Sequence, residues 1–183
     1  WGVKNNEIVV GFHASAKWES KTWPEASFVE VARKLVNKHN AQILLFGSSS
    51  EYDANQRIVD SVGNNAINCT TVLFEEFAGL LKRCNLVVGN DSGIIHFAGA
   101  VGTPAVVIYF ATFPRHSTPW GVAPAVQVIG NIKPIPQGTY LKDYPYAEET
   151  KKTVTPTMVI EAVDKVLCLE STGGKQKSKE TRE

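Results

Sequence analysis

The sequence is poor in cysteine and methionine and contains no long apolar run. Its three cysteines, Cys69, Cys84 and Cys168, are odd in number and far apart. This argues against a disulfide framework or a zinc site and favours buried thiols in a reducing compartment. No apolar run approaches the roughly 20 residues needed to span a bilayer, and no signal peptide is recognisable. These absences predict a cytoplasmic protein.

A surplus of charge of either sign is also lacking, because 19 Lys and Arg residues balance 18 Asp and Glu residues. Such a balance creates no overall field that attracts nucleic acid or an anionic membrane. We therefore expect no nucleic-acid partner, and any phosphate must be bound by a local arrangement of residues.

Several motifs of known enzyme classes are absent as well. No G-x-G-x-x-G follows a strand, which argues against a dinucleotide oxidoreductase, and no G-x-S-x-G forms a hydrolase elbow. The run from Gly47 to Glu51 lacks the lysine of a Walker loop. No D-x-D is present to hold magnesium on a diphosphate. We expect neither a metal nor a cofactor, so that Lys21, His96 and a helix N-terminus would neutralise a bound diphosphate.

Length and composition suit one compact domain over residues 1–170, because 43% hydrophobic residues can build a sizeable core. Residues 171–183 form a Gly-Lys-Ser-Glu tail, which we predict to be disordered. The chain begins at Trp1, and Met158 is its only methionine. We therefore expect it to be a piece of a longer protein.

The hydrophobic pattern predicts an α/β fold. Short apolar runs, most of them without alternation, predict six parallel strands covered on both faces: Glu7–Phe12, Ala41–Phe46, Asn65–Cys69, Leu86–Gly89, Ala105–Tyr109 and Val126–Ile129. Helical spacing of apolar residues predicts four helices between the strands: Phe28–His39, Tyr52–Val62, Phe74–Cys84 and Ile94–Val101. A cap and first-turn proline at Thr155-Pro156 predict a fifth helix, Thr155–Leu167, after the last strand. This order predicts a doubly wound, Rossmann-like sheet whose ligands bind beyond the carboxyl ends of the strands.

The most informative segment is Gly89–His96, which turns a strand into a helix of small residues. The amides of Ser92 and Gly93 would lie unpaired at the helix start, where the dipole favours an anion. His96 follows Ser92 by one helical turn and shares its face. We interpret the segment as a phosphate site. Two alternatives stay open: Asp91 or Ser92 is only a helix cap, and His96 is only a core histidine among apolar neighbours.

Two further polar clusters follow the first and second predicted strands. Lys21, beside Trp23, can place a point charge on a diphosphate, whereas Lys17 is equally well explained as a solvated surface charge. Glu51 can accept both hydroxyls of a ribose, or it only stabilises the dipole of the helix it begins. Both clusters are expected at the same edge of the sheet as Ser92.

Four motifs together resemble a known family. They are Lys-x-Trp-Pro at 21–24, Leu-Leu-Phe-Gly at 44–47, Val-Val-Gly-Asn-Asp-Ser-Gly at 87–93 with His96, and Gly-Thr-Pro at 102–104. Their order and spacing resemble glycosyltransferase family 9, the ADP-heptose:lipopolysaccharide heptosyltransferases, over about Ile8 to Leu167. The resemblance implies a GT-B enzyme of two Rossmann-like halves. This chain is similar to the carboxyl-terminal half, which binds the nucleotide-sugar donor.

The resemblance also implies partners and site residues. The family transfers heptose from ADP-heptose to the lipopolysaccharide core, at the inner face of the bacterial inner membrane and without a metal. Its general base is an aspartate of the amino-terminal half, so the catalytic residue is not expected here. The implied donor contacts are Ser15 and Lys21 with the phosphates, Glu51 with the ribose, the backbone around Val72 with adenine, and Asp91, Ser92, Gly93 and His96 with the diphosphate and sugar.

The chain departs from the family pattern after the fifth strand, where Phe110–Arg115 replaces F-G-P-T-D-P. We expect the contacts with the transferred sugar to differ there more than the nucleotide contacts. Two alternative functions stay open at this point: a non-catalytic nucleotide- or phosphate-binding module, and another GT-B transferase or a sugar epimerase.

Overall fold

The computed structural model describes residues 2–3, 8–119 and 123–177. Its strands are β1 Val9–His13, β2 Gln42–Leu45, β3 Ala66–Asn68, β4 Leu86–Asn90, β5 Ala105–Tyr109 and β6 Ala125–Ile129. Its α-helices are α1 Glu25–His39, α2 Tyr52–Val62, α3 Phe74–Arg83, α4 Gly93–Ala100, α5 Ala147–Thr150 and α6 Pro156–Lys177. Short 3-10 helices are η1 Glu19–Lys21, η2 Ser49–Glu51, η3 Pro114–His116, η4 Leu141–Asp143 and η5 Lys151–Thr153.

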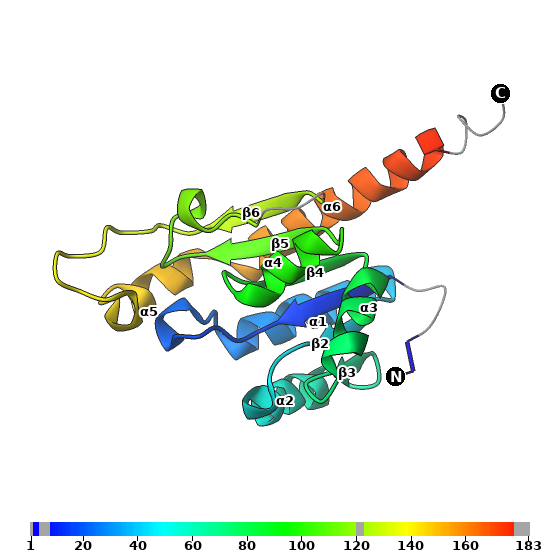
Figure 1. Ribbon diagram of the computed structural model, residues 1–183, viewed down its shortest axis with the longest axis horizontal. Helices are drawn as coiled ribbons and strands as arrows, with labels where there is room; N and C mark the ends of the chain where they lie inside the picture. Colours follow the sequence, from blue (N-terminus) through cyan, green and yellow to red (C-terminus); the bar gives the residue numbers. More distant parts are fainter. Residues whose placement is uncertain (1, 4–7, 120–122, 178–183) are drawn as a thin grey trace.

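The six strands form one parallel sheet in the order β3-β2-β1-β4-β5-β6, which confirms the predicted doubly wound fold. The strand order reverses between the neighbours β1 and β4, where His13 lies opposite Gly89 in the register. Every pairing is parallel, so all strands end at the same edge of the sheet; Figure 1 shows the arrows of β1, β5 and β6 pointing to that edge. In such sheets a ligand crevice opens outside the carboxyl ends at this reversal point.

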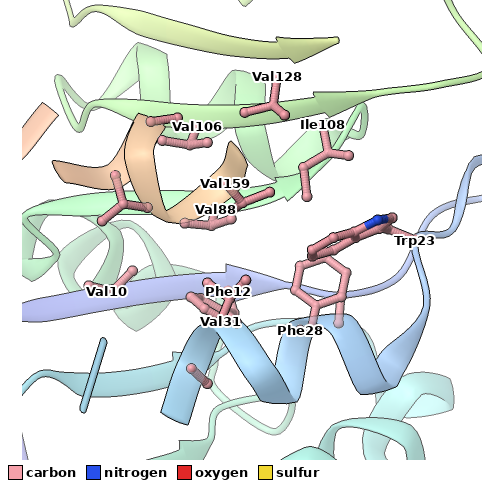
Figure 2. Packing of buried hydrophobic residues seen from close by; sticks show 14 of the residues in the cluster. Val10, Phe12, Trp23, Phe28, Val31, Val88, Val106, Ile108, Val128 and Val159 are labelled. Carbon is pink, nitrogen blue, oxygen red and sulfur yellow. The ribbon is translucent and has the colours of Figure 1, made fainter. Parts of the chain in front are cut away.

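Two apolar clusters cover the two faces of the sheet. On one face, residues of β1, β4, β5 and β6 pack against α1 and α6, as Figure 2 shows around Phe12, Val88 and Val159. Trp23 and Phe28 extend this cluster, with ring centroids 5.1 Å apart and edge-to-face. On the other face, residues of β2, β4 and β5 pack against α3 and α4. Burial on both faces explains why most of the strands are nearly continuous apolar runs.

Glycine is required at one position of the central strand. A Cβ on Gly11 would lie 2.8 Å from Cε2 of Phe46 and 3.2 Å from Sγ of Cys84. Close packing leaves no room for even a methyl group here. The side chains of Phe46, directly after β2, and Cys84, directly after α3, therefore approach the backbone of β1 closely.

The structure departs from the prediction mainly after β6. The segment between β6 and α6 contains α5, η4 and η5, which are short turns without a readable hydrophobic period. Helix α6 runs to Lys177 and projects beyond the sheet (Figure 1). Residues 171–177 belong to this helix, and the disorder predicted for the tail stays a prediction. Residues 178–183 of the predicted tail lie outside the described residues. No helix in the described ranges has the length and apolarity to cross a membrane.

Candidate functional site

The loops that follow β1 and β4 are tied together at the reversal point of the sheet. The fully buried Asn90 donates from Nδ2 to the carbonyls of Ala14 (3.0 Å) and Ser15 (3.2 Å). Its Oδ1 accepts the backbone N–H of Trp23 at 3.1 Å. Sequence reasoning placed Asn90 inside the key motif but assigned it no role. Asn90 holds the β1–α1 loop against the start of α4, which keeps the polar groups of both loops together.

Helix α4 begins without a side-chain cap. Ser92 occupies the N-cap position with extended backbone, yet its hydroxyl makes no capping hydrogen bond. Instead, Oγ of Ser92 lies 3.0 Å from Nδ1 of His13. Of the two residues in the helix-cap alternative, Ser92 is the N-cap by position, but its side chain contacts His13 and does not cap the helix. The first turn, from Gly93, presents its amides without help from this hydroxyl, and such a terminus attracts anions.

His13 is the functional candidate that sequence reasoning missed. It ends β1, is only 6% exposed, and places Nε2 3.8 Å from Oε1 of Glu51. Burial lowers the pKa of His13, and the nearby Glu51 carboxylate offsets only part of that effect. The available signal was a titratable side chain at the carboxyl end of a buried strand. His13 links the hydroxyl of Ser92 to the carboxylate of Glu51.

Glu51 has two partners with different roles. Its Oε2 accepts from the backbone N–H and the hydroxyl of Ser48, which completes a capping box at η2. Burial raises the pKa of Glu51, but the hydrogen bonds from Ser48, the nearby His13 and a hydrogen bond from Ser15 together lower it below its ordinary value. Glu51 is thus an ionised carboxylate that stabilises a helix start. Its contact with a ribose stays a prediction.

Lys21 and Asp91 form a nearly buried ion pair. Nζ of Lys21 lies 2.6 Å from Oδ2 of Asp91, and the side chains are 14% and 7% exposed. The same oxygen accepts the hydroxyl of Thr112 at 2.7 Å. Lys21 therefore balances a carboxylate of the site and is not an uncompensated positive charge. Thr112 comes from the segment where the chain departs from the family pattern.

Two cavities meet at the start of α4, and Ser92 and Gly93 line both. The large cavity, of about 760 Å³, is bordered by His13, Glu51, Val72, Ser92 and Gly93, among others. The small cavity, of about 330 Å³, is bordered by Lys17, Trp18, Lys21, Asp91, Ser92, Gly93, His96 and Ser117. The structure thus gathers seven of the eight predicted site residues around one helix terminus.

The remaining predicted residues have distinct positions. Ser15 lines a third cavity, of about 610 Å³, which it shares with Glu51. His96 is exposed and lines the small cavity, so the alternative that it is a core histidine is wrong. Lys17 lines both the large and the small cavity, with its ammonium 5.4 Å from the ring centroid of Trp18. Lys17 is thus exposed, as the surface-charge alternative expects, and it also borders both cavities.

One wall of the large cavity is aromatic, which sequence reasoning did not anticipate. Phe74 and Phe77 of α3 and Phe97 of α4 form a cluster with ring centroids 5.9 to 6.4 Å apart. Phe74 is 68% exposed and Phe97 46% exposed. Large exposed apolar groups beside a cavity are typical of ligand sites. The cavity combines this apolar wall with polar groups at the start of α4.

The three cysteines differ in their exposure to solvent. No group of three or more His, Cys, Asp and Glu side chains gathers in the described part of the chain in a way that could hold a metal ion. Cys69 and Cys84 are buried as predicted, and burial raises their pKa to about 11 and about 12. Cys168 is exposed on α6, so the prediction of a buried thiol is wrong there. The apolar residues next to Cys168 in the sequence do not show whether Cys168 lies on the face of the helix that packs against the core.

A family profile and the curated relatives agree on one family for this chain. The profile of glycosyltransferase family 9 (heptosyltransferase) matches residues 3–143. The chain is 26% identical over 174 residues to lipopolysaccharide heptosyltransferase 2 of Salmonella typhimurium, which covers 91% of this chain and 49% of that protein. It is 28% identical over 182 residues to lipopolysaccharide heptosyltransferase 3 of Escherichia coli, covering 94% and 50%.

Solved structures agree on the fold. The E. coli ADP-heptose lps heptosyltransferase II superposes with a TM-score of 0.79 at 23% identity, covering 93% of this chain and 49% of that chain. An E. coli heptosyltransferase with ADP superposes with a TM-score of 0.68 at 19% identity, covering 87% and 44%. The chain spans about half the length of the curated relatives it matches, and that half is the carboxyl-terminal one.

Proposed function

Because the chain belongs to glycosyltransferase family 9 (heptosyltransferase), we propose that it is the donor-binding half of a glycosyltransferase that uses an ADP-linked sugar, with ADP-heptose as the favoured donor. The observation that carries the proposal is the start of α4. There the Ser92 hydroxyl turns away from the helix and the uncapped terminus separates two cavities. A sugar nucleotide has an anion in its middle and a neutral group on each side, which matches this order.

The proposed binding mode follows from the character of each cavity. The large cavity receives the nucleoside, because it has an aromatic wall and the Glu51 carboxylate and its volume is in the range of ligand pockets. The diphosphate lies against Ser92 and Gly93 at the helix start, where amides and dipole favour negative charge. The small cavity receives the sugar, beside Asp91 and His96.

The chemistry of this half is assistance to the leaving group. Glycosyl transfer leaves a nucleoside diphosphate, and donors held in position stabilise its growing charge as the bond to the anomeric carbon breaks. The α4 amides, Ser92 and Lys17 supply such donors in our proposal. Lys21 contributes through Asp91, since the two form an ion pair. No metal is required in this scheme.

The remaining functions belong to the half of the relatives that this chain does not match. We propose that this other half binds the acceptor, a lipopolysaccharide core as the names of the relatives suggest. It would also supply the general base that deprotonates the acceptor hydroxyl. The donor-binding half alone should therefore bind a nucleotide but show almost no transfer.

Thermal shift with nucleotides tests the proposal. We expect ADP to raise the melting temperature more than UDP or GDP, with the same rise after addition of a chelator. For the donor-binding half alone we expect a micromolar to millimolar dissociation constant for ADP, which corresponds to a binding free energy on the order of 4 to 8 kcal/mol. Equal shifts with all three nucleotides would instead favour a general phosphate-binding module, and a larger shift with UDP would favour a different GT-B transferase or an epimerase.

A further inference from the structure

His13 is buried between two groups that the proposed function places on neighbouring parts of the nucleotide, Ser92 on the diphosphate and Glu51 on the ribose. Nδ1 faces the Ser92 hydroxyl at 3.0 Å, and Nε2 faces the Glu51 carboxylate at 3.8 Å. Gly89 leaves room for this position, because a Cβ there would lie 3.2 Å from Cβ of His13. The ring thus connects the phosphate end of the site to the ribose end.

The neighbours of the ring determine where its proton lies in the free protein. A neutral imidazole has one N–H, and an ionised carboxylate can only accept a hydrogen bond. Glu51 is ionised, so the proton lies on Nε2 of His13 and points toward Glu51. Nδ1 is then an acceptor, and the Ser92 hydroxyl must donate to it. In this state the hydroxyl has no proton to offer to a ligand without losing its bond to His13.

A bound phosphate reverses this requirement. A phosphate oxygen only accepts hydrogen bonds, so Ser92 must donate to it and Nδ1 of His13 loses its donor. A proton from solvent at Nδ1 restores the bond, now from His13 to Ser92. The resulting imidazolium lies between the Glu51 carboxylate and the phosphate, and both negative charges stabilise it.

We propose that His13 is a positioning residue that takes up one proton when a nucleoside diphosphate binds, and that this proton turns the Ser92 hydroxyl from His13 toward the phosphate. The inference rests on the proposed function. It makes donor binding favourable at lower pH and release favourable at higher pH.

Other charged and titratable groups near the ring fit this scheme. Burial lowers the pKa of His13 in the free protein, so the ring is neutral and ready to accept a proton near neutral pH. Of the other titratable groups along the large cavity, Cys69 has a pKa raised to about 11 and is uncharged. Lys17 is exposed and packs over the Trp18 ring. Its positive charge adds to the attraction of a phosphate.

Nuclear magnetic resonance of the histidine rings tests the inference on the unaltered chain. We expect ADP to raise the pKa of the His13 ring by one unit or more, and adenosine, which lacks phosphate, to leave it unchanged. In the pH range between the pKa of His13 in the free protein and its pKa in the ADP complex, the affinity for ADP should fall by up to about tenfold for each unit that the pH rises. A His13 pKa that ADP leaves unmoved, or that adenosine raises equally, would overturn the inference.

Calorimetry in buffers of different ionisation enthalpy counts the protons taken up. His13→Gln keeps a hydrogen-bonding side chain but cannot titrate. His39→Gln is the matched control, because His39 of α1 also lies against a carboxylate, that of Asp164, and borders none of the three cavities described above. Subtracting one variant from another cancels any proton that ADP itself exchanges. Wild type and His39→Gln should take up about one proton more than His13→Gln. Equal uptake by all three would refute the role of His13. Failure of ADP to bind the wild type at all would overturn the proposed function and this inference with it.

Discussion

Lys21→Ala should destabilise the protein even without a ligand. The change removes the ammonium 2.6 Å from Oδ2 of Asp91 and leaves a carboxylate that is 7% exposed with the Thr112 hydroxyl as a remaining donor. A hydrogen bond to a charged group contributes about 1.5 to 3 kcal/mol, and removal of one partner from a fully buried pair costs about 3 to 5 kcal/mol. Because Lys21 is 14% exposed and Thr112 remains, we expect a loss of about 2 to 3 kcal/mol.

The assay is thermal unfolding of the wild type, Lys21→Ala, Asp91→Asn and the double variant. For a chain of this size, each kcal/mol corresponds to roughly 2 to 4 °C, so Lys21→Ala should melt about 4 to 12 °C lower. Asp91→Asn removes the other charge, and the double variant should lose less than the sum of the single variants. The two sites should couple by about 1 to 3 kcal/mol.

Lys17→Ala is the control, since Lys17 is exposed and lies on the same loop. It should melt within about 1 °C of the wild type, because exposed charges contribute little to stability. An unchanged melting temperature for Lys21→Ala, or strictly additive losses in the double variant, would refute the ion pair as a structural element. Lys21 would then be a free positive charge for the ligand.

Three other variants test the site and its supports. Ser92→Ala should weaken ADP binding by roughly tenfold to a hundredfold, measured by titration, because one hydrogen bond to a charged group is lost, whereas Ser50→Ala on the rim of the large cavity should bind normally. Gly11→Ala should lower stability in urea by about 1 to 3 kcal/mol through overpacking, and Gly79→Ala, which meets no atom within 4 Å, should not lower it. Burial lowers the pKa of His13 in the folded state, so the unfolded protein binds one more proton than the folded protein once the pH falls below about 6.5. The free energy of unfolding should therefore decline as the pH falls from about 7.5 to 5.5. The decline should be smaller for His13→Gln. Identical pH profiles for both proteins would show that folding does not lower the pKa of His13.

The sequence was sufficient for the sheet because its strands are buried on both faces. All six runs became strands within about three residues of their predicted ends, and the helices that flank them carry a clear period. Segments without such a period were missed, among them α5. The order of the strands in the sheet could not be predicted from periodicity, because it depends on how the connections between the strands pack in the whole domain.

The candidate site shows a similar division. Residue type and position at strand ends located Lys21, Glu51, Asp91, Ser92 and His96 near one rim, as the structure shows. Their pairings were not predictable, because hydrogen bonds such as that between Ser92 and His13 join residues 79 positions apart. The aromatic wall was also missed, since exposed phenylalanines on an amphipathic helix resemble core residues in sequence. The donor contacts, the cytoplasmic location and the acceptor stay predictions.

The most direct test of the proposed nucleotide site is an amide-resolved magnetic resonance titration with ADP. If the diphosphate lies at the start of α4 and the nucleoside in the large cavity, the largest shifts should come from the amides of Ser92, Gly93 and Val72. The amides of Arg33 in α1 and Ser61 in α2, which border neither the large nor the small cavity, should not move. Shifts concentrated around Arg33 and Ser61, or spread without preference over the protein, would contradict the proposed donor site.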